Sequence, residues 1–278
     1  MIFYPTISGR ILACVSALLL LACLSTPLTG ATLLHHWTFD EGSGSLVADS
    51  VGSANMSING TSNSWTNGKA GGAFTFDGSN YARTDTSDIV TNPSSSVAIA
   101  GWFKTAANVA DRSWLFQIES NYGMRISNNG RLQLSFNGSV NSAPEWGSPI
   151  DDGLWYHFVA QNDGTTTQLY IDGSSVGSRA QTLSSLTDGF RNSAIGARQS
   201  GQAIFAGTFD DIRYYDAVLT QSEISALAQI SNVPPVAQAD SYTVAMNTEL
   251  VVGSPGVLSN DSETDGDEAT AVLVDDVA

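Results

Sequence analysis

The sequence predicts an all-β protein, an antiparallel sandwich of two sheets, on three observations. Short runs that alternate apolar and polar residues recur from residue 32 to about residue 215, and this period of two is typical of half-buried strands. Asn-Gly and Asp-Gly pairs, which favour tight hairpin turns, separate the runs. The chain holds 26 glycines and only 14% charged residues, which suits short strands and turns better than long helices. Many short strands joined by tight turns indicate a sandwich or jelly roll.

The strands are expected in a regular order along the chain. They cover residues 33–39, 73–76, 97–103, 131–136, 155–159 and 167–171. Turns are expected at Asp77-Gly78, Asn129-Gly130, Asn137-Gly138, Asp163-Gly164 and Asp172-Gly173. Such pairs favour type I′ turns, in which both central residues take positive φ. The last two turns follow each other closely and predict an antiparallel meander.

One helix is expected near the end of the sandwich. Thr220-Gln-Ser-Glu223 has the pattern of a capping box, in which the Thr hydroxyl caps an amide and the Glu reaches back. Ile224, Leu227 and Ala228 then recur at helical spacing. The segment Asn232-Val-Pro-Pro235 ends the helix because proline cannot continue it, and we place a domain boundary there.

The N-terminus, residues 1–31, predicts a signal peptide. An apolar run from Ile11 to Leu24 follows Arg10 and is too short for a comfortable membrane span. Cleavage after Thr29-Gly-Ala31 would release a soluble chain, whereas Leu20-Leu-Ala-Cys23 resembles a bacterial lipobox and would attach a lipid at Cys23. Both cleavage alternatives predict an extracellular or cell-surface protein, which contacts a membrane only if it is lipidated. Both cysteines lie in this run, so no disulfide is expected afterwards.

The net charge of −16 and the pI near 4.2 exclude some partners. An acidic surface repels phosphate backbones, so we expect no nucleic-acid binding. An excess of carboxylates is compatible with Ca²⁺, which prefers hard oxygen ligands. The alternative is that acidity only keeps an exported protein soluble.

The tail, residues 232–278, differs in composition from the sandwich. It holds nine carboxylates and no Lys or Arg. It has only two apolar runs, and half a sandwich cannot bury its own core. We therefore expect the first part of a second β domain.

Five segments of the sandwich region, in the order in which they follow along the chain, resemble laminin-G-like domains of the concanavalin A-like lectin/glucanase group. The matching segments are His36-Trp-Thr-Phe-Asp-Glu-Gly-Ser-Gly44, Gly68-Lys-Ala-Gly-Gly-Ala-Phe-Thr-Phe-Asp-Gly78, Ala100-Gly-Trp-Phe103, Trp155-Tyr-His-Phe-Val159 with Leu169-Tyr-Ile-Asp-Gly173, and Gly207-Thr-Phe-Asp-Asp-Ile-Arg-Tyr-Tyr215 with Leu219-Thr-Gln-Ser-Glu-Ile224. The resemblance implies a two-sheet antiparallel jelly roll over residues 32–231. The tail is similar to bacterial cadherin-like or Ig-like tandem repeats, through Pro235-Val-Ala-Gln-Ala-Asp-Ser-Tyr242, Gly256-Val-Leu-Ser-Asn-Asp261 and Asp265-Gly-Asp267.

The sandwich region offers no catalytic pattern, so we expect a protein that is not an enzyme. Glycosidases need two carboxylates that flank the scissile bond, and residues 32–231 contain no E-x-D-x-x-E run. Asp210 and Asp211 are adjacent, which in a regular strand directs them to opposite faces. The histidines are His35, His36 and His157. We expect His157 to be packed or exposed in its strand and not catalytic. His35 and His36 are adjacent and point to opposite faces, so we expect no chelating pair. A catalytic domain outside residues 1–278 stays open.

Two groups of carboxylates are candidate calcium ligands. Asp40 ends the first strand and Asp211 lies in the last long strand, and terminal strands of jelly rolls are commonly neighbours. The resemblance supports a structural Ca²⁺ at this kind of position, with Asp77 or Asp210 as a further ligand. The alternatives are a turn residue at Asp77 and a capping carboxylate at Asp40. In the tail, the candidate ligands are Asn260, Asp261, Asp265 and Asp267, with a plain turn as the alternative.

Three aromatic residues are candidates for glycan binding, because sugars stack on exposed aromatic faces. Trp65, Tyr122 and Trp146 lie in polar, loop-like stretches, whereas Trp37, Trp102 and Trp155 lie in apolar runs that predict core. The alternative is that the first three only cover the rim of the sandwich.

The leading hypothesis is a secreted or surface binding and adhesion module, carbohydrate-binding and stabilised by Ca²⁺, with a glycan or a surface protein as ligand. Its rivals are a structural spacer in a large repeat protein and a glycan hydrolase or lyase on the same fold.

Overall fold

The computed structural model describes residues 30–60, 64–84, 95–106, 113–118, 121–186, 193–230, 236–243, 246, 249, 251–253 and 256–261. The predicted signal peptide up to residue 29, with Cys23, lies outside these residues. The Pro pair at the predicted domain boundary also lies outside them, as do Asp265 and Asp267 of the tail. Within the described residues, no helix is both long and apolar enough to cross a membrane.

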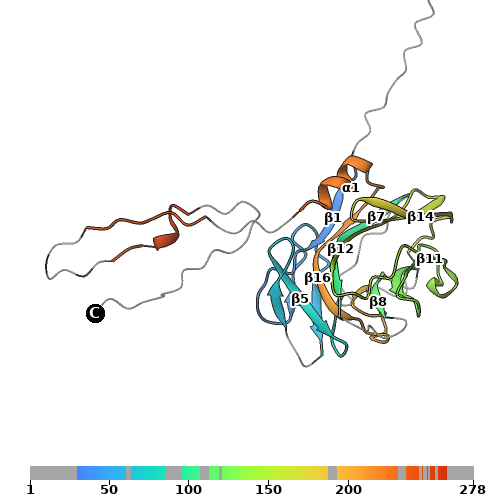
Figure 1. Ribbon diagram of the computed structural model, residues 1–278, viewed down its shortest axis with the longest axis horizontal. Coiled ribbons are helices and arrows are strands. Elements are labelled where there is room, and N and C mark those ends of the chain that lie inside the picture. Colours follow the sequence, from blue (N-terminus) through green and yellow to red (C-terminus); the bar gives the residue numbers. More distant parts are fainter. Residues whose placement is uncertain are drawn as a thin grey trace, which may run out of the picture.

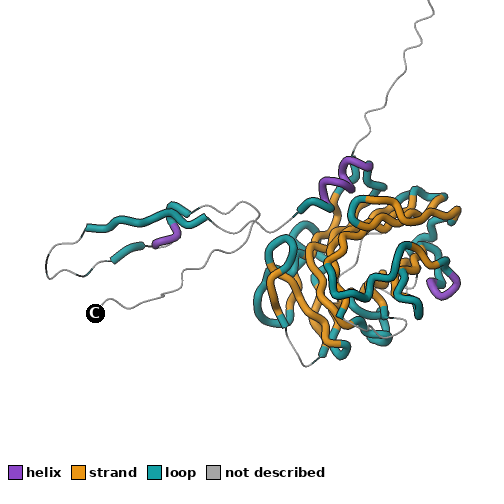
Figure 2. Tube along the Cα trace, viewed as in Figure 1, coloured by secondary structure: helices purple, strands orange, loops and turns teal. Residues whose placement is uncertain are grey.

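Two antiparallel sheets form a sandwich (Figures 1 and 2). Sheet A has the order β14 (Ser174–Ala180), β13 (Thr166–Ile171), β12 (Trp155–Asn162), β7 (Val97–Thr105), β16 (Ala206–Tyr215), β5 (Gly72–Asp77) and β4 (Trp65–Asn67), and β1 (Leu33–Trp37) pairs with β16. Sheet B has the order β11 (Glu145–Trp146), β10 (Leu132–Ser135), β9 (Tyr122–Ile126), β8 (Trp114–Ile118), β15 (Ser193–Ile195), β6 (Tyr81–Thr84), β3 (Met56–Asn59) and β2 (Leu46–Val47). The helical elements are η1 (Val140–Ser142), α1 (Gln221–Leu227) and η2 (Gly256–Leu258).

The main core lies between the inner faces of the two sheets, which face each other. It is rich in aromatic side chains, and Phe209 contacts both Phe76 and Phe103 within it. A second, smaller core lies on the outer face of sheet A, where α1 packs its residues Ile224 and Leu227. The predicted capping box is present: Thr220 Oγ1 accepts from the Glu223 amide, and the Glu223 carboxylate accepts from the Thr220 amide.

The predicted strands are confirmed, with small changes at their ends. The predicted turn type is confirmed only at Asp172-Gly173, where φ is +48° and +78°. At the other four Asn-Gly and Asp-Gly turns, only the glycine takes positive φ. The Asp163-Gly164 loop holds a third residue before β13 begins, and longer loops are built on turns other than type I′.

A β-bulge in β16 changes the direction of two side chains. The pairing of β16 with β7 shifts between Asp210 and Arg213, and Asp211 takes φ +54°. Phe209 and Ile212 both lie in the inner core, so the two aspartates between them share the outer face. The prediction that Asp210 and Asp211 point to opposite faces is therefore wrong, because a bulge inserts an extra residue into the alternation.

The tail is described only in short pieces, and the prediction of a cadherin-like repeat stays a prediction. Asp261 accepts a hydrogen bond from the Gln238 amide at 2.7 Å, and Asn260 donates to the Ala239 carbonyl at 3.4 Å. These contacts bring two segments of the tail together and assign neither residue to a metal.

Candidate functional site

Asp210 is fully buried on the outer face of sheet A. Its Oδ2 accepts from the amides of Lys69 and Ala70, which lie in the loop between β4 and β5. Its Oδ1 is buried and has no hydrogen-bond partner. Burial raises the pKa of Asp210 to about 8, so the group is a neutral carboxylic acid at neutral pH. The loop can approach this closely because residue 68 is glycine, whose Cβ would collide with the Asp210 carboxyl.

Asp211 is the buried partner of a histidine and an arginine. Its Oδ1 lies 2.6 Å from His36 Nε2 and 3.0 Å from Arg213. Strand β1 pairs with β16, as expected for terminal strands, and this brings Asp40 close enough for its charge to interact with that of Asp211. The Asp40 carboxylate itself accepts from the Gly72 amide at 2.6 Å.

These residues do not fit the predicted calcium ion. An Arg guanidinium shares the Asp211 carboxylate, and a dication next to it would be repelled. In the part of the chain that the structure describes, no group of three or more His, Cys, Asp or Glu side chains is arranged to hold a metal. Calcium binding therefore stays a prediction, without support from the geometry at Asp40 and Asp211.

Asp77 lies apart from the other three aspartates. Asp40 contacts Gly72 at the first residue of β5, whereas Asp77 is its last residue. Five extended residues span about 16 Å, so one ion cannot bind both carboxylates. Asp77 Oδ1 accepts from the amide and the hydroxyl of Ser79. These contacts are those of a turn residue, and a metal role of Asp77 stays a prediction.

The prediction that the chain is not an enzyme stays a prediction. The bulge removes one argument for it, because Asp210 and Asp211 share a face. Both are at most 3% exposed. Of the histidines, His35 contacts Asp49 at 2.6 Å and stacks on Trp37. His157 is 1% exposed, and burial lowers its pKa to about 4.

Two of the three aromatic candidates do not form an open stacking surface. Tyr122 is a strand residue of β9, is 1% exposed, and donates its hydroxyl to the Ser184 carbonyl. Trp65 is half-buried at the sheet edge, packs edge-on against Phe74, and donates to the Gly44 carbonyl. Trp155, predicted as core, is instead half-buried on the outer face with the Lys104 ammonium over its ring.

Trp146 lines a cavity of about 210 Å³, which we call the edge cavity. The cavity lies where the end strands of the two sheets meet, β11 and β10 on one side and β12 to β14 on the other. Its lining is mostly apolar and consists of Leu132, Trp146, Gly147, Ser148, Pro149, Ile150, Tyr156, Ile171 and Val176. Trp146 is 8% exposed and packs on Gly177, where a Cβ would come within 2.5 Å of the indole.

Polar groups surround the edge cavity. The Tyr156 hydroxyl donates to Asp152 Oδ2 at 2.7 Å, and this hydrogen bond lowers the pKa of Asp152. Burial, together with the same contact, raises the pKa of Tyr156 to about 12. Arg131 donates to the Gly147 carbonyl at 2.6 Å and so fixes one wall. An apolar cavity with a few oriented polar groups at its rim is the usual form of a small-molecule site.

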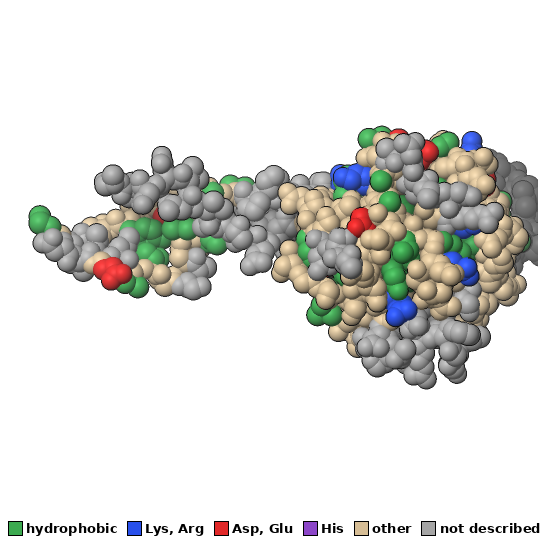
Figure 3. Space-filling view, turned by 90° about the horizontal axis from the view of Figure 1, so that it is seen from below, with side chains coloured by type: hydrophobic (Ala, Val, Ile, Leu, Met, Phe, Trp, Pro, Cys, Tyr) green, Lys and Arg blue, Asp and Glu red, His purple; other side chains and the backbone are tan. Residues whose placement is uncertain are grey.

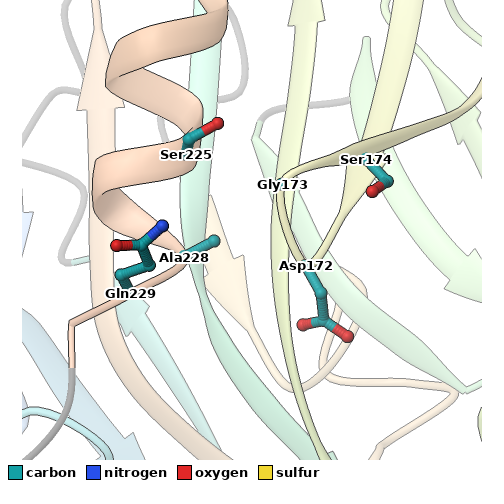
Figure 4. Close-up of a pocket in the computed structure, with 6 residues that line it drawn as sticks. All are labelled: Asp172, Gly173, Ser174, Ser225, Ala228 and Gln229. Atoms are coloured by element: carbon teal, nitrogen blue, oxygen red, sulfur yellow. The ribbon is translucent and has the colours of Figure 1, made fainter.

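A second hollow of about 220 Å³ lies between α1 and the β13–β14 turn (Figure 4). Ser225, Ala228 and Gln229 line it from the helix side, opposite Asp172 to Ser174. It contains no aromatic side chain. The edge cavity is therefore the better candidate for a sugar.

Sequence reasoning identified Trp146 and missed the residues that make it part of a cavity. Tyr156, Ile171 and Val176 lie in or next to the strands of the predicted meander. Alternation of residues along a strand shows which side chains share a face, but it does not show which face is the inner one. Trp155 and Tyr156 are adjacent aromatics, so either one was equally suited to the core.

Comparisons with known proteins agree with this architecture. The model of the family "Concanavalin A-like lectin/glucanases superfamily" matches residues 76–225. Domain 4 of AbnA, an extracellular GH43 arabinanase from Geobacillus stearothermophilus solved with arabinotriose, shares 23% identity at a TM-score of 0.57. The match covers 72% of this chain and all of that domain.

Two other similar structures come from larger chains. Trypanosoma rangeli sialidase shares 15% identity at a TM-score of 0.51, over 70% of this chain and 32% of the sialidase. The binding domain of Paraclostridial Mosquitocidal Protein 1 shares 14% identity at a TM-score of 0.51, over 70% of this chain and 51% of that one. At these identities the likeness shows the fold alone.

Proposed function

The chain belongs to the concanavalin A-like lectin/glucanase superfamily, and on that premise we propose that it is an exported carbohydrate-binding module whose sugar site is the edge cavity. The observation that carries this proposal is the pairing of Trp146 and Tyr156 in one cavity with an apolar lining. The apolar faces of a sugar ring pack against aromatic side chains. Its hydroxyls need hydrogen-bonding groups at the rim, since unpaired polar groups are costly to bury.

The rim offers these groups. The Asp152 carboxylate is exposed and keeps acceptor capacity beyond the Tyr156 hydroxyl. Ser148 lies in the lining with its hydroxyl as donor and acceptor. The hydrogen bonds from Tyr156 to Asp152 and from Arg131 to the Gly147 carbonyl fix the rim before a ligand binds. A fixed rim loses less conformational entropy on binding.

The comparisons support a carbohydrate ligand by analogy: AbnA domain 4 was solved with arabinotriose. Adhesion and attachment to the cell surface stay parts of this proposal that rest on the predicted signal peptide and tail. The structural-spacer hypothesis is the rival, and it expects no glycan binding at all.

A glycan array followed by calorimetric titration with the best neutral oligosaccharide tests the proposal. The informative variant is Tyr156→Ala, since Tyr156 lines the cavity and is only half-buried. We expect binding to weaken by about tenfold or more, in line with the loss of an aromatic contact and a hydrogen bond.

Trp155→Ala is the matched control. It removes the neighbouring half-buried aromatic residue of β12, whose side chain lies on the outer face with Lys104, and it should leave glycan affinity unchanged. Circular dichroism checks that both variants keep the β-sheet spectrum of the parent. Absence of binding to every glycan, or equal loss in the two variants, would sink the edge cavity as the sugar site.

A further inference from the structure

The outer face of sheet B carries an arginine cluster on a chain whose net charge is −16. The cluster consists of Arg83, Arg125, Arg131 and Arg198. The inner neighbours Ala82, Met124 and Leu132 lie in the core, so strand alternation places the first three arginines on or next to the outer face. Figure 3 shows one face of the molecule, on which Lys and Arg side chains form small separate patches beside a few Asp and Glu side chains.

Arg198 is held over the ring of Trp114. Its guanidinium lies 5.5 Å from the centre of the indole, within the range of a cation–π contact. Trp114 in turn lies flat on Gly123, where a Cβ would come within 2.5 Å of the ring. Glycine at this position therefore allows the indole to lie on the sheet and carry Arg198 on its other side.

The loop that carries Arg198 is ordered by its own hydrogen bonds. The Arg198 amide donates to the Gln202 carbonyl at 2.9 Å, and the Gly201 amide donates back to Arg198 at 2.8 Å. Gln117, on the outer face of β8, accepts from the Gln199 amide at 3.1 Å. Gln199 Oε1 is buried and has no hydrogen-bond partner. An exposed guanidinium on an ordered loop loses little freedom when it binds an anion.

Strands β9 and β10 carry polar side chains in the same row as Trp114. Register places Arg125 opposite Trp114 and Gln133 opposite Arg125. Arg125 is only 7% exposed and donates to Gln133 Oε1 at 2.9 Å, so its charge acts on the face from a buried position. Two strands from β8 on the other side, Arg83 lies over the Tyr81 ring at 5.9 Å. The register places Arg83 in the row of Ala194 and Gln117, not in that of Trp114, and about 10 Å from β8 at the usual strand spacing.

Among the described residues, carboxylates lie at the end of the cluster that holds Arg131 and Arg125. Glu145 faces Arg131 and Arg125, which help to lower its pKa after its hydrogen bond to Asn129. Asp151 lies beside the turn at Gly130. The ion pairs of the described residues involve His35, His36 and Arg213. Within the described ranges, none of these ion pairs joins a carboxylate to Arg83 or Arg198.

We propose that the outer face of sheet B binds an anionic glycan, whose carboxylate or sulfate groups are held by the exposed Arg198 and the half-buried Arg83, while the buried Arg125 adds positive charge to the face. Guanidinium groups bind both anions in bidentate geometry, and the buried Trp114 supports Arg198 from below. This inference rests on the proposed function in taking the ligand to be a glycan, and it adds the charge of the ligand and a second surface. Strand β11 joins the two sites, since Glu145 lies on the outer face and Trp146 lines the edge cavity.

Two matched pairs of polymers test the proposal: dextran sulfate with dextran, and polygalacturonate with its methyl ester. Affinity gel electrophoresis at low ionic strength measures the dissociation constant of the purified chain for each. We expect one anionic polymer to bind and its neutral counterpart to bind at least about tenfold more weakly. The pair that responds distinguishes sulfate from carboxylate.

The double variant Arg83→Gln/Arg198→Gln should weaken binding of the anionic polymer by about tenfold or more. Lys104→Gln is the control, because Lys104 also lies over a tryptophan but on the outer face of sheet A. Equal binding of charged and neutral polymers, absence of binding to both anionic polymers, or an equal effect of Lys104→Gln overturns the inference. Neutral glycan binding that Tyr156→Ala removes would still support the edge cavity in that case.

Discussion

Replacement of Asp210 by Asn is the sharpest test of the buried polar cluster. The carboxyl is fully buried, accepts two amides from the loop between β4 and β5, and has no partner at Oδ1. Asn has the same shape, keeps an oxygen for the two amides, and never ionises. The variant therefore removes the cost of a buried charge while it leaves the packing intact.

The magnitude follows from the pKa of Asp210, which burial raises from 3.8 to about 8. Between these values the native state holds a proton that the unfolded state has released, so stability falls as pH rises. At 1.36 kcal/mol per pKa unit, the carboxyl costs about 4 kcal/mol at pH 7 relative to strong acid. This is a large fraction of the usual 5–15 kcal/mol for a domain.

Urea unfolding followed by tryptophan fluorescence measures the effect. From about pH 5 to pH 8, the parent should lose about 4 kcal/mol relative to Asp210→Asn. Asp163→Asn, at an exposed turn whose amides lower the pKa of Asp163, is the control and should not remove the slope. Parallel pH curves for the parent and Asp210→Asn would refute the reasoning, as would a variant destabilised equally at both pH values.

Three further substitutions test other buried contacts. Burial lowers the pKa of His157 from 6.5 to about 4, so the parent should lose about 3 kcal/mol of unfolding free energy as pH falls from 6.5 to 4. His157→Gln should remove this loss, which urea unfolding at the two pH values measures. Gly177→Ala should cost about 1–3 kcal/mol by overpacking, since its Cβ would come within 2.5 Å of Trp146, and a shift of tryptophan emission should accompany it. Asp49→Ala should cost at least about 3 kcal/mol in thermal unfolding, because four amides and His35 lose their acceptor.

Much of the fold is visible in the sequence because it depends on local patterns. Alternation in the runs that contain Phe76 and Val159 predicts strands, and the capping box at Thr220 places the helix start at the correct residue. Turn type is less visible. Positive φ at both central residues requires a two-residue loop, which exists at Asp172-Gly173 and not at Asp163-Gly164.

The sites depend on contacts that no local pattern contains. The bulge at Asp211 reverses the alternation of β16, and nothing in Asp210-Asp211 distinguishes a bulged strand from a regular one. Trp146 meets Val176 only because the edge strands of the two sheets lie together. Arg198 gains its platform through Gly123, which lies far away in the chain.

Salt dependence separates the two proposed surfaces, because they bind through different forces. The edge cavity is lined mainly by apolar groups, whereas Arg83 and Arg198 are partly or fully exposed cations. Screening shortens from about 30 Å at 0.01 M salt to about 3 Å at 1 M, so exposed charges lose most of their attraction over this range. We expect neutral oligosaccharides to keep their affinity while an anionic polymer loses about tenfold or more. Calorimetry at the two ionic strengths measures both, and an anionic polymer whose affinity does not change with salt would show that the arginine cluster is not its site. A charged glycan that spans strand β11 would contact both surfaces. At high salt the arginine contacts are screened, so its remaining affinity would come from the edge cavity alone. Tyr156→Ala should then abolish that remaining affinity.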